Sequence, residues 1–212
     1  MSQTPKHALT VEAAMAETLQ RIRPYAFVAA ALIRPDPLRA DGTIGRKLEI
    51  ASAQTLVGQA EAIEAGLAGH AELITPVQLE PTDQPWSSAF QAVGFRSLLI
   101  VRIPVVSSHC FEFVLFSSSG YSNDESINGA AAEIMRAWPM WRATLSQYVC
   151  PLTAREREAL LAVAGGFTGA EASEGIGVTT RTFRLHVINA RKKLFAANGP
   201  DATHRAHLLC AF

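Results

Sequence analysis

Cysteines and long apolar runs are scarce in this sequence of 212 residues. Cys110, Cys150 and Cys210 are widely spaced and form no C-x-x-C pair, and no histidines stand at metal-site spacing. We therefore expect no disulfide bond and no metal site. No apolar run reaches the roughly 18 residues needed to cross a bilayer, and the N-terminal stretch lacks the apolar segment of a signal peptide. These absences predict a cytoplasmic protein without membrane contact.

Catalytic motifs are absent as well. The sequence contains no glycine-rich phosphate loop, no H-E-x-x-H and no G-x-S-x-G. His109 and Cys110 are neighbours, but on a strand their side chains point to opposite faces and cannot form a nucleophile–base pair. The first half also lacks the set of aspartates that a phosphorylated receiver domain requires. An enzyme and a receiver are both disfavoured, and no cofactor is expected.

A net charge of either sign is also missing, because 19 basic residues balance 19 acidic ones. The charges are nevertheless unevenly distributed. Residues 1–149 contain 11 basic and 14 acidic residues, whereas residues 150–212 contain 8 basic and 5 acidic residues. The chain is long enough for two domains, and an acidic front part followed by a basic end is typical of a regulator with a terminal DNA-binding domain.

The basic end carries the start signals of three helices. Capping boxes of the form T-x-x-E begin at Thr153 and at Thr168. Gly175 and Gly177 end the second helix, and Thr179 caps the third. Two short helices and a tight glycine turn before a further helix predict a helix-turn-helix.

The third of these helices, residues 180–195, has two different faces. Rotation by 100° per residue gathers an apolar stripe on one side, formed by Phe183, Val187, Ala190 and Leu194. The opposite side gathers Arg181, Arg184, Ile188 and Lys192, with Leu185 and Arg191 at its edges. An aliphatic residue among cations suits the DNA major groove, where arginine pairs with guanine and an aliphatic group contacts the thymine methyl. The alternative is a solvated face with one stray apolar residue.

Residues 152–208 resemble the LuxR-type helix-turn-helix. The pattern L-T-x-R-E-x-E is matched by Leu152, Thr153, Arg155, Glu156 and Glu158. The pattern A-x-G-x-T-N-x-E-I-A is matched by Ala164, Gly166, Thr168 and Glu171, with Gly169, Ala172 and Ser173 in place of its Asn, Ile and Ala. The pattern T-V-x-x-H-x-x-N-I-x-x-K-L is matched by Thr182, His186, Asn189, Lys193 and Leu194, with Phe183 and Ala190 in place of its Val and Ile. The small Ala172 and Ser173 are expected to thin the core beneath the second helix.

The resemblance implies a bacterial transcription regulator that binds double-stranded DNA as a homodimer, with RNA polymerase as a further candidate partner. The predicted base-reading residues are Arg181, Arg184, Leu185 and Ile188. The predicted phosphate contacts are Thr168, Thr179, Thr180, Thr182, Lys192 and Lys193. A fourth helix, from about Asp201 to Cys210, would serve as the dimer contact. The alternative is an orphan regulator or anti-activator that acts by protein contact without a ligand.

The front part alternates helix and strand signals. Residues 11–22 predict a helix that Pro24 stops, residues 25–33 and 43–50 predict two strands, and Ser52 begins a helix with an apolar face that reaches Leu67. A proline-punctuated connection follows. Residues 97–106 and 110–117 then predict a hairpin joined by a short link. We expect a mostly antiparallel sheet with helices beside it.

This order of elements resembles the GAF and PAS sensor domains, to which the lactone-binding domains of LuxR-type receptors are related in shape. The motif of spaced tryptophan, tyrosines and Asp-Pro in those receptors is missing, so recognition of a lactone is not implied. A small-molecule ligand remains a candidate partner. Trp86, Phe90 and Phe95 either line its pocket or belong to the core, and the core is the commoner place for such aromatics.

Residues 124–147 predict a long helix with a heptad seam of Ile127, Ala131, Ile134, Trp138, Trp141 and Leu145. The seam packs on the sheet, pairs with a second copy, or does both, and Pro139 disfavours a long continuous coiled coil. The predicted fold is α+β, with a GAF/PAS-like α-β-α sensor domain at residues 1–148. An all-α, four-helix LuxR-type helix-turn-helix domain follows at residues 149–212.

Overall fold

The computed structural model describes residues 10–51, 60–67, 72–79, 85–106, 109–119 and 123–212. Its internal contacts divide the chain into two compact units. The first unit comprises Met1–Arg34, Lys47–Pro104 and Cys110–Trp141. The second comprises Pro35–Arg46, Val105–His109 and Arg142–Phe212. Each unit has its own core and is described separately.

The first unit is built around a five-stranded sheet. Its strands are β1 (Ala29–Asp36), β2 (Gly45–Ala51), β3 (Ile74–Gln78), β4 (Ser97–Val106) and β5 (His109–Ser117). They lie in the order β2-β1-β5-β4-β3. The β1–β5 pair is antiparallel, with Ala31 opposite Val114, and so is the β3–β4 pair, with Thr75 opposite Ile100. The predicted hairpin forms β4 and β5 at the middle of the sheet.

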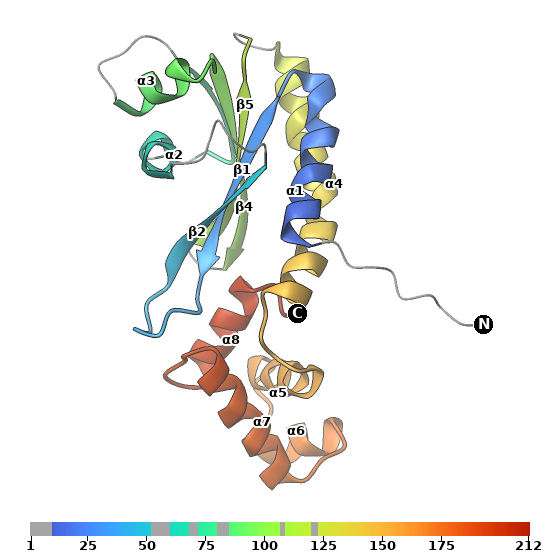
Figure 1. Ribbon diagram of the computed structural model, residues 1–212. Coiled ribbons are helices and arrows are strands. Elements are labelled where there is room, and N and C mark those ends of the chain that lie inside the picture. Colours follow the sequence, from blue (N-terminus) through green and yellow to red (C-terminus); the bar gives the residue numbers. More distant parts are fainter. Residues whose placement is uncertain (1–9, 52–59, 68–71, 80–84, 107–108, 120–122) are drawn as a thin grey trace, which may run out of the picture. The chain divides into compact units, whose positions relative to one another are not determined.

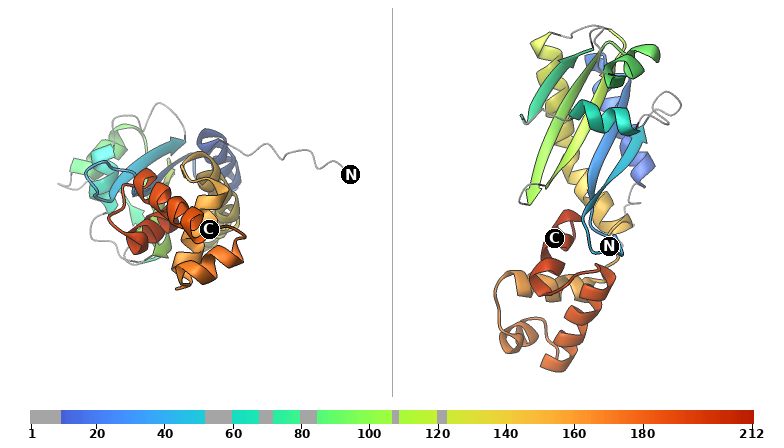
Figure 2. Two further views of the ribbon diagram at one scale, coloured as in Figure 1. Left: turned by 90° about the horizontal axis from the view of Figure 1, so that it is seen from below. Right: turned by 90° about the vertical axis from the view of Figure 1, so that its left-hand side faces the viewer.

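Helices cover both faces of this sheet (Figures 1 and 2). The helices α1 (Val11–Ile22) and α4 (Asp124–Tyr148) lie side by side on one face. The shorter helices α2 (Ala60–Leu67) and α3 (Pro85–Ala92) lie on the other. Because successive side chains of a strand point to opposite faces of the sheet, the strands contribute apolar side chains to the packing on both faces. The predicted α-β-α layering is confirmed.

The seam of α4 packs within the chain. Ala131, Ile134 and Trp141 are at most 3 % exposed. The ring of Trp138 contacts Phe111 at a centroid distance of 4.9 Å, and the Trp141 ring contacts Phe113 at 5.7 Å. This part of the helix therefore packs on the sheet, and pairing of α4 with a second copy stays a prediction. The helix continues through Pro139, which is exposed.

The front part differs from the prediction in two places. The predicted strand 25–33 begins late, because Arg23–Tyr25 forms a 3-10 helix (η1) and Ala26 has a left-handed φ of 68°, so that β1 starts at Ala29. The proline-punctuated connection contains β3 and α3, neither of which was predicted. The predicted start of a helix at Ser52 lies outside the described residues.

In the described part of the second unit, four helices follow the end of α4, and Figure 1 draws them from orange to red. They are α5 (Ala154–Ala164), α6 (Gly169–Gly175), α7 (Thr180–Lys193) and α8 (Gly199–Leu208). Both predicted capping boxes are present at Thr153 and Thr168, and Thr179 caps α7 as predicted. Between α6 and α7, Gly177 has a φ of 69°, a conformation that glycine adopts without strain.

The fourth helix begins earlier than predicted, at Gly199, because Asn198 caps it and Pro200 occupies its first turn. Arg205 on α8 is buried and forms an ion pair with Asp201 at 3.0 Å. Its guanidinium also donates hydrogen bonds to the carbonyl oxygens of Pro37 and Gly42, which belong to the same unit. These bonds satisfy a cation that would otherwise be costly to bury.

Candidate nucleic-acid interface

The helix α7 is held in place by one apolar stripe. Phe183, Ala190 and Leu194 are at most 5 % exposed, and the partly buried Val187 packs beside Phe183. These are the four residues that the helical spacing predicted for the buried side. Ala190 and Leu194 contribute to a core shared with Leu160 of α5 and Ala206 of α8. With one side of α7 fixed in this way, the opposite side is turned outward.

The outward face carries the predicted base-reading residues. Arg181, Arg184 and Lys192 are exposed. Leu185 and Ile188, at 50 % and 43 % exposure, lie among them. Large aliphatic side chains usually lie inside a domain, so their exposure between cations marks a surface suited to mixed polar and apolar contact. The structure thus brings all four predicted base-reading residues to the exposed side of one helix.

Four of the predicted phosphate contacts are threonines at helix starts. Thr168 caps α6 and donates to Glu171 Oε2 at 2.7 Å. The hydroxyls of Thr179 and Thr182 lie 2.9 Å apart at the start of α7, and that of Thr180 lies 3.1 Å from Ser173 Oγ. These hydroxyls have structural partners. The backbone N–H groups in the first turn of α7 are of the kind that binds phosphate oxygens.

The two lysines at the end of α7 differ in their surroundings. Lys192 is exposed, whereas the ammonium of Lys193 lies 2.8 Å from Glu156 Oε2. Burial alone would raise the pKa of Glu156, but hydrogen bonds from Lys193 and Thr153 outweigh that effect and lower it. The ionised carboxylate therefore joins the end of α7 to the start of α5. The motif pointed to Glu156 as a capping residue, but its role as the partner of Lys193 was not predicted.

The electrostatic character of α7 differs from that of its neighbours. Residues 180–193 contain five basic residues and no acidic one, whereas residues 154–175 contain four acidic and two basic residues. Positive charge is therefore concentrated on the helix that presents the exposed face. Such a stripe of cations is the electrostatic feature that binds a phosphate backbone.

The candidate ligand residues lie in the core of the first unit. The Phe90 and Phe95 rings both contact Phe116 of β5, at centroid distances of 5.1 Å and 5.0 Å. Trp86 is half-buried and packs edge-on against Phe90. Its ring also lies against Gly66 of α2, where an added Cβ would approach it to 3.0 Å. The three aromatics thus join α3 to the sheet and to α2, and a role toward a ligand stays a prediction.

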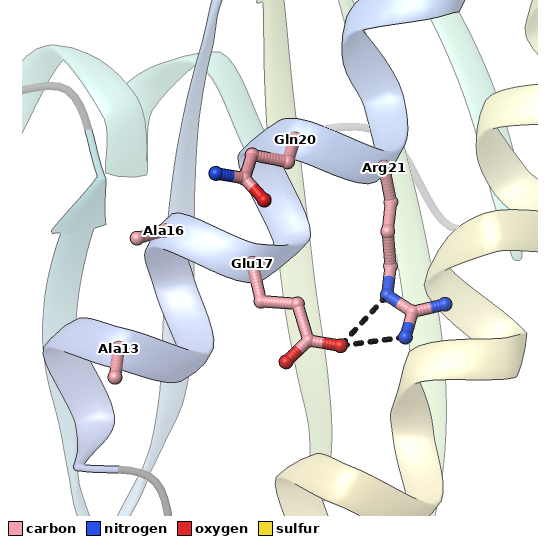
Figure 3. Close-up of a pocket in the computed structure, with 5 residues that line it drawn as sticks. All are labelled: Ala13, Ala16, Glu17, Gln20 and Arg21. Carbon is pink, nitrogen blue, oxygen red and sulfur yellow. Dashed lines mark hydrogen bonds and ion pairs between the residues drawn. The ribbon is translucent and has the colours of Figure 1, made fainter.

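A shallow hollow on α1 is lined by Ala13, Ala16, Glu17, Gln20 and Arg21 (Figure 3). Its charged groups bind each other, because the Arg21 guanidinium lies 2.6 Å from Glu17 Oε1 and 3.7 Å from Glu133 Oε2. These pairs are partly exposed and contribute little to stability.

Among the described residues, no helix is both long and apolar enough to span a membrane.

The geometry defines a class of domain. Two short helices, a left-handed glycine turn and a third helix with an exposed basic face form a helix-turn-helix of the DNA-binding kind. Residues 150–206 match the model of the family described as bacterial regulatory proteins, luxR family. The resemblance inferred from the motifs is thus confirmed for this part of the chain.

A curated relative shares this part of the chain. The transcriptional activator protein AnoR of Acinetobacter nosocomialis is 45% identical over 64 residues. These residues make up 30% of this chain and 27% of AnoR. The match thus spans about a quarter of the relative's length.

Solved structures extend the likeness to the first unit. SdiA in complex with octanoyl-rac-glycerol has a TM-score of 0.56 at 15% sequence identity, covering 99% of this chain and 97% of that chain. SdiA from Escherichia coli has a TM-score of 0.56 at 17% identity, covering 97% of this chain and 93% of that chain. At these identities the likeness establishes the fold. The predicted α+β class, with a sheet domain followed by a helical domain, is confirmed.

Proposed function

We propose that the chain is a transcription regulator that binds double-stranded DNA sequence-specifically through α7. The observation that carries the proposal is the exposed face of α7, on which Leu185 and Ile188 lie among arginines and lysine. In the major groove, arginine donates two hydrogen bonds to a guanine edge and an aliphatic side chain contacts the thymine methyl. Arg181 and Arg184 are assigned the first role, and Leu185 and Ile188 the second.

The phosphate backbone would be bound around this face. Lys192 and the first-turn N–H groups of α7 are the assigned contacts, with Thr168, Thr179, Thr180 and Thr182 beside them. Lys193 is also a proposed phosphate contact, although its ammonium pairs with Glu156. The protein would act in the cytoplasm as a homodimer on a pseudo-palindromic site. RNA polymerase is the proposed partner in transcription, and the protein performs no catalysis of its own.

The test is selection of duplexes from a random DNA pool by the purified full chain, followed by sequencing. We expect enrichment of a two-fold symmetric site with half-sites about one helical turn apart. Arg184→Glu should abolish the enrichment, because it places a carboxylate against the phosphates and base edges. Arg23→Glu, which changes an exposed arginine of the first unit, is the control and should bind as the wild type does.

The two contrary results have different meanings. No enrichment by the folded wild type would contradict the DNA-binding function and favour the orphan regulator that acts by protein contact. Equal enrichment by Arg184→Glu would support DNA binding but would contradict the role of α7 as the helix that reads the bases.

The first unit is proposed to sense a small molecule with an acyl chain. The support is the shared fold with SdiA, which was solved in complex with octanoyl-rac-glycerol, and the aromatic cluster of Trp86, Phe90 and Phe95 that joins α3 to the sheet and to α2. Octanoyl-rac-glycerol should raise the Tm of the full chain. At a ligand concentration of a hundred times Kd, binding increases the free energy of unfolding by about 2.7 kcal/mol. Trp86→Ala should lose this response, whereas the exposed-site control Tyr148→Ala should keep it. An unchanged Tm of the wild type would contradict this ligand class.

A further inference from the structure

The helix-turn-helix unit contains a hollow between α5 and α6. Its volume is about 280 Å³. Most of its lining is apolar, and the lining residues are Glu158, Leu161, Ala162, Phe167, Glu171, Ala172, Gly175 and Ile176. None of the residues assigned to read DNA bases is among them. The hollow therefore belongs to a different surface of the same unit.

Small side chains create the space. Ala172 lies on the buried side of α6 and Gly175 is the last residue of that helix, and neither side chain is large enough to fill the gap toward α5. The LuxR-type pattern has isoleucine where this chain has Ala172. Two large apolar side chains border the space and remain in solvent, with Leu161 53 % and Phe167 59 % exposed. An open hollow with exposed apolar walls marks a surface where apolar side chains of a partner can be buried.

The rim of the hollow is acidic. The Glu171 carboxylate accepts hydrogen bonds from Thr168, which lower its pKa and keep it ionised at neutral pH. Glu158 is also on the rim, where Arg155 binds it at 2.7 Å and donates to the Ile176 carbonyl at 3.1 Å. The two carboxylates of the rim outnumber the one guanidinium that binds there, so the rim has an excess of negative charge. The surface therefore complements a partner that is both apolar and basic.

We propose that the α5–α6 hollow binds a basic amphipathic helix of another DNA-bound protein, whose bulky apolar side chains enter between Leu161 and Phe167. The inference rests on the proposed function, because proteins bound beside this one on DNA are themselves rich in lysine and arginine. A groove between two helices suits a helix that inserts apolar residues spaced three or four apart. The volume lies just below the roughly 300–1,000 Å³ of small-molecule sites and suits one or two side chains.

The experiment selects peptides of about 18 residues, long enough for a stable amphipathic helix, from a displayed random library on the full chain. Counter-selection uses Ala172→Ile, which fills the hollow with the side chain of the family pattern. We expect enriched peptides with leucine or phenylalanine at i and i+4 beside lysine or arginine. Their affinity should fall at least ten-fold on Ala172→Ile, and roughly five-fold on Glu158→Lys because a rim charge is reversed.

The matched control is Ala170→Ile, which adds the same atoms at an exposed position of α6 outside the hollow and should leave peptide binding unchanged. Duplex binding by Ala172→Ile is measured in parallel and should equal that of the wild type, so loss of DNA binding and loss of peptide binding are separate results. Failure to enrich any peptide, enrichment of acidic ones, or equal binding to Ala172→Ile would overturn the proposal. So would self-association of the wild type that Ala172→Ile abolishes, because the occupant would then be a second copy.

Discussion

The ion pair between Lys193 and Glu156 connects the basic helix α7 to the core of the second unit. Glu156 is 4 % exposed, and its carboxylate accepts from both Lys193 Nζ and the Thr153 backbone N–H, each at 2.8 Å. Two hydrogen bonds donated to a carboxylate favour its ionised form. The pair thus joins the end of α7 to the buried carboxylate at the start of α5.

This pair predicts acid sensitivity of the second unit. The folded-state pKa of Glu156 lies below its ordinary value of 4.5, so the stabilisation is complete above about pH 4.5 and is lost as pH falls through the folded value. Asp201 has a lowered pKa as well, because hydrogen bonds from Ala197 and Arg205 outweigh its burial. Amide exchange in α5 and α7 should therefore accelerate as pH is lowered toward 3, after correction for the intrinsic rate.

Glu156→Gln separates the two carboxylates. It should be less stable than the wild type at neutral pH, because the lysine loses its counter-ion, and its stability should depend less on pH below about 4.5. An unchanged acid response in Glu156→Gln would show that the pair contributes nothing to folding.

At the scale of elements, α1 is attached to α4 through a buried polar contact. The Trp141 indole N–H donates to Thr18 Oγ1 at 3.0 Å, and Thr18 in turn donates to the Ala14 carbonyl at 2.8 Å. Both Thr18 and Trp141 are fully buried. An indole N–H that loses its acceptor in such a place has no access to water.

Thr18→Val should therefore destabilise the first unit by about 1–3 kcal/mol, although the two side chains have the same shape. Thr18→Ser keeps the hydroxyl and removes one methyl group, which costs about 0.8 kcal/mol. Urea unfolding followed by tryptophan fluorescence measures both. The native emission maximum should shift only in Thr18→Val. Identical spectra and midpoints for the two variants would mean that the hydrogen bond has no role in the fold.

Strong local signals made many elements predictable from the sequence. The helix Val11–Ile22 has the predicted bounds, since its apolar residues repeat at helical spacing and Pro24 follows. The caps at Thr153, Thr168 and Thr179 fixed the starts of three helices of the second unit to the residue. These signals depend only on neighbours a few residues away.

Elements without such signals were not predicted. The strand β3 has five residues and contains Pro76, which a strand tolerates here because β3 lies at the edge of the sheet. The helix α3 has eight residues, and its one signal is Pro85 at the first position followed by Trp86 and Phe90 four residues apart. The ion pair of Lys193 with Glu156 joins residues 37 positions apart, and no local pattern reveals it.

At the scale of the whole molecule, the chain separates an aromatic, sheet-based unit from a basic, helical one. The helix α4 is continuous from Asp124 to Tyr148, and its residues from Arg142 onward belong to the second unit. Net charge is zero for the chain, so the proposed affinity for DNA rests on local charge on α7 rather than on the total. The affinity for DNA should therefore fall as the salt concentration rises, with a slope set by the small number of phosphate contacts.

The most direct test of the account compares Arg184→Ala with Lys192→Ala on the selected duplex and on its single-base variants. Arg184→Ala should cost about 1–3 kcal/mol and relax the preference at one base pair of each half-site. Lys192→Ala should weaken all sequences equally and lower the slope of log K against log salt by about 1. Equal weakening on every sequence by both variants, or no effect of either, would contradict the claim that α7 reads the bases.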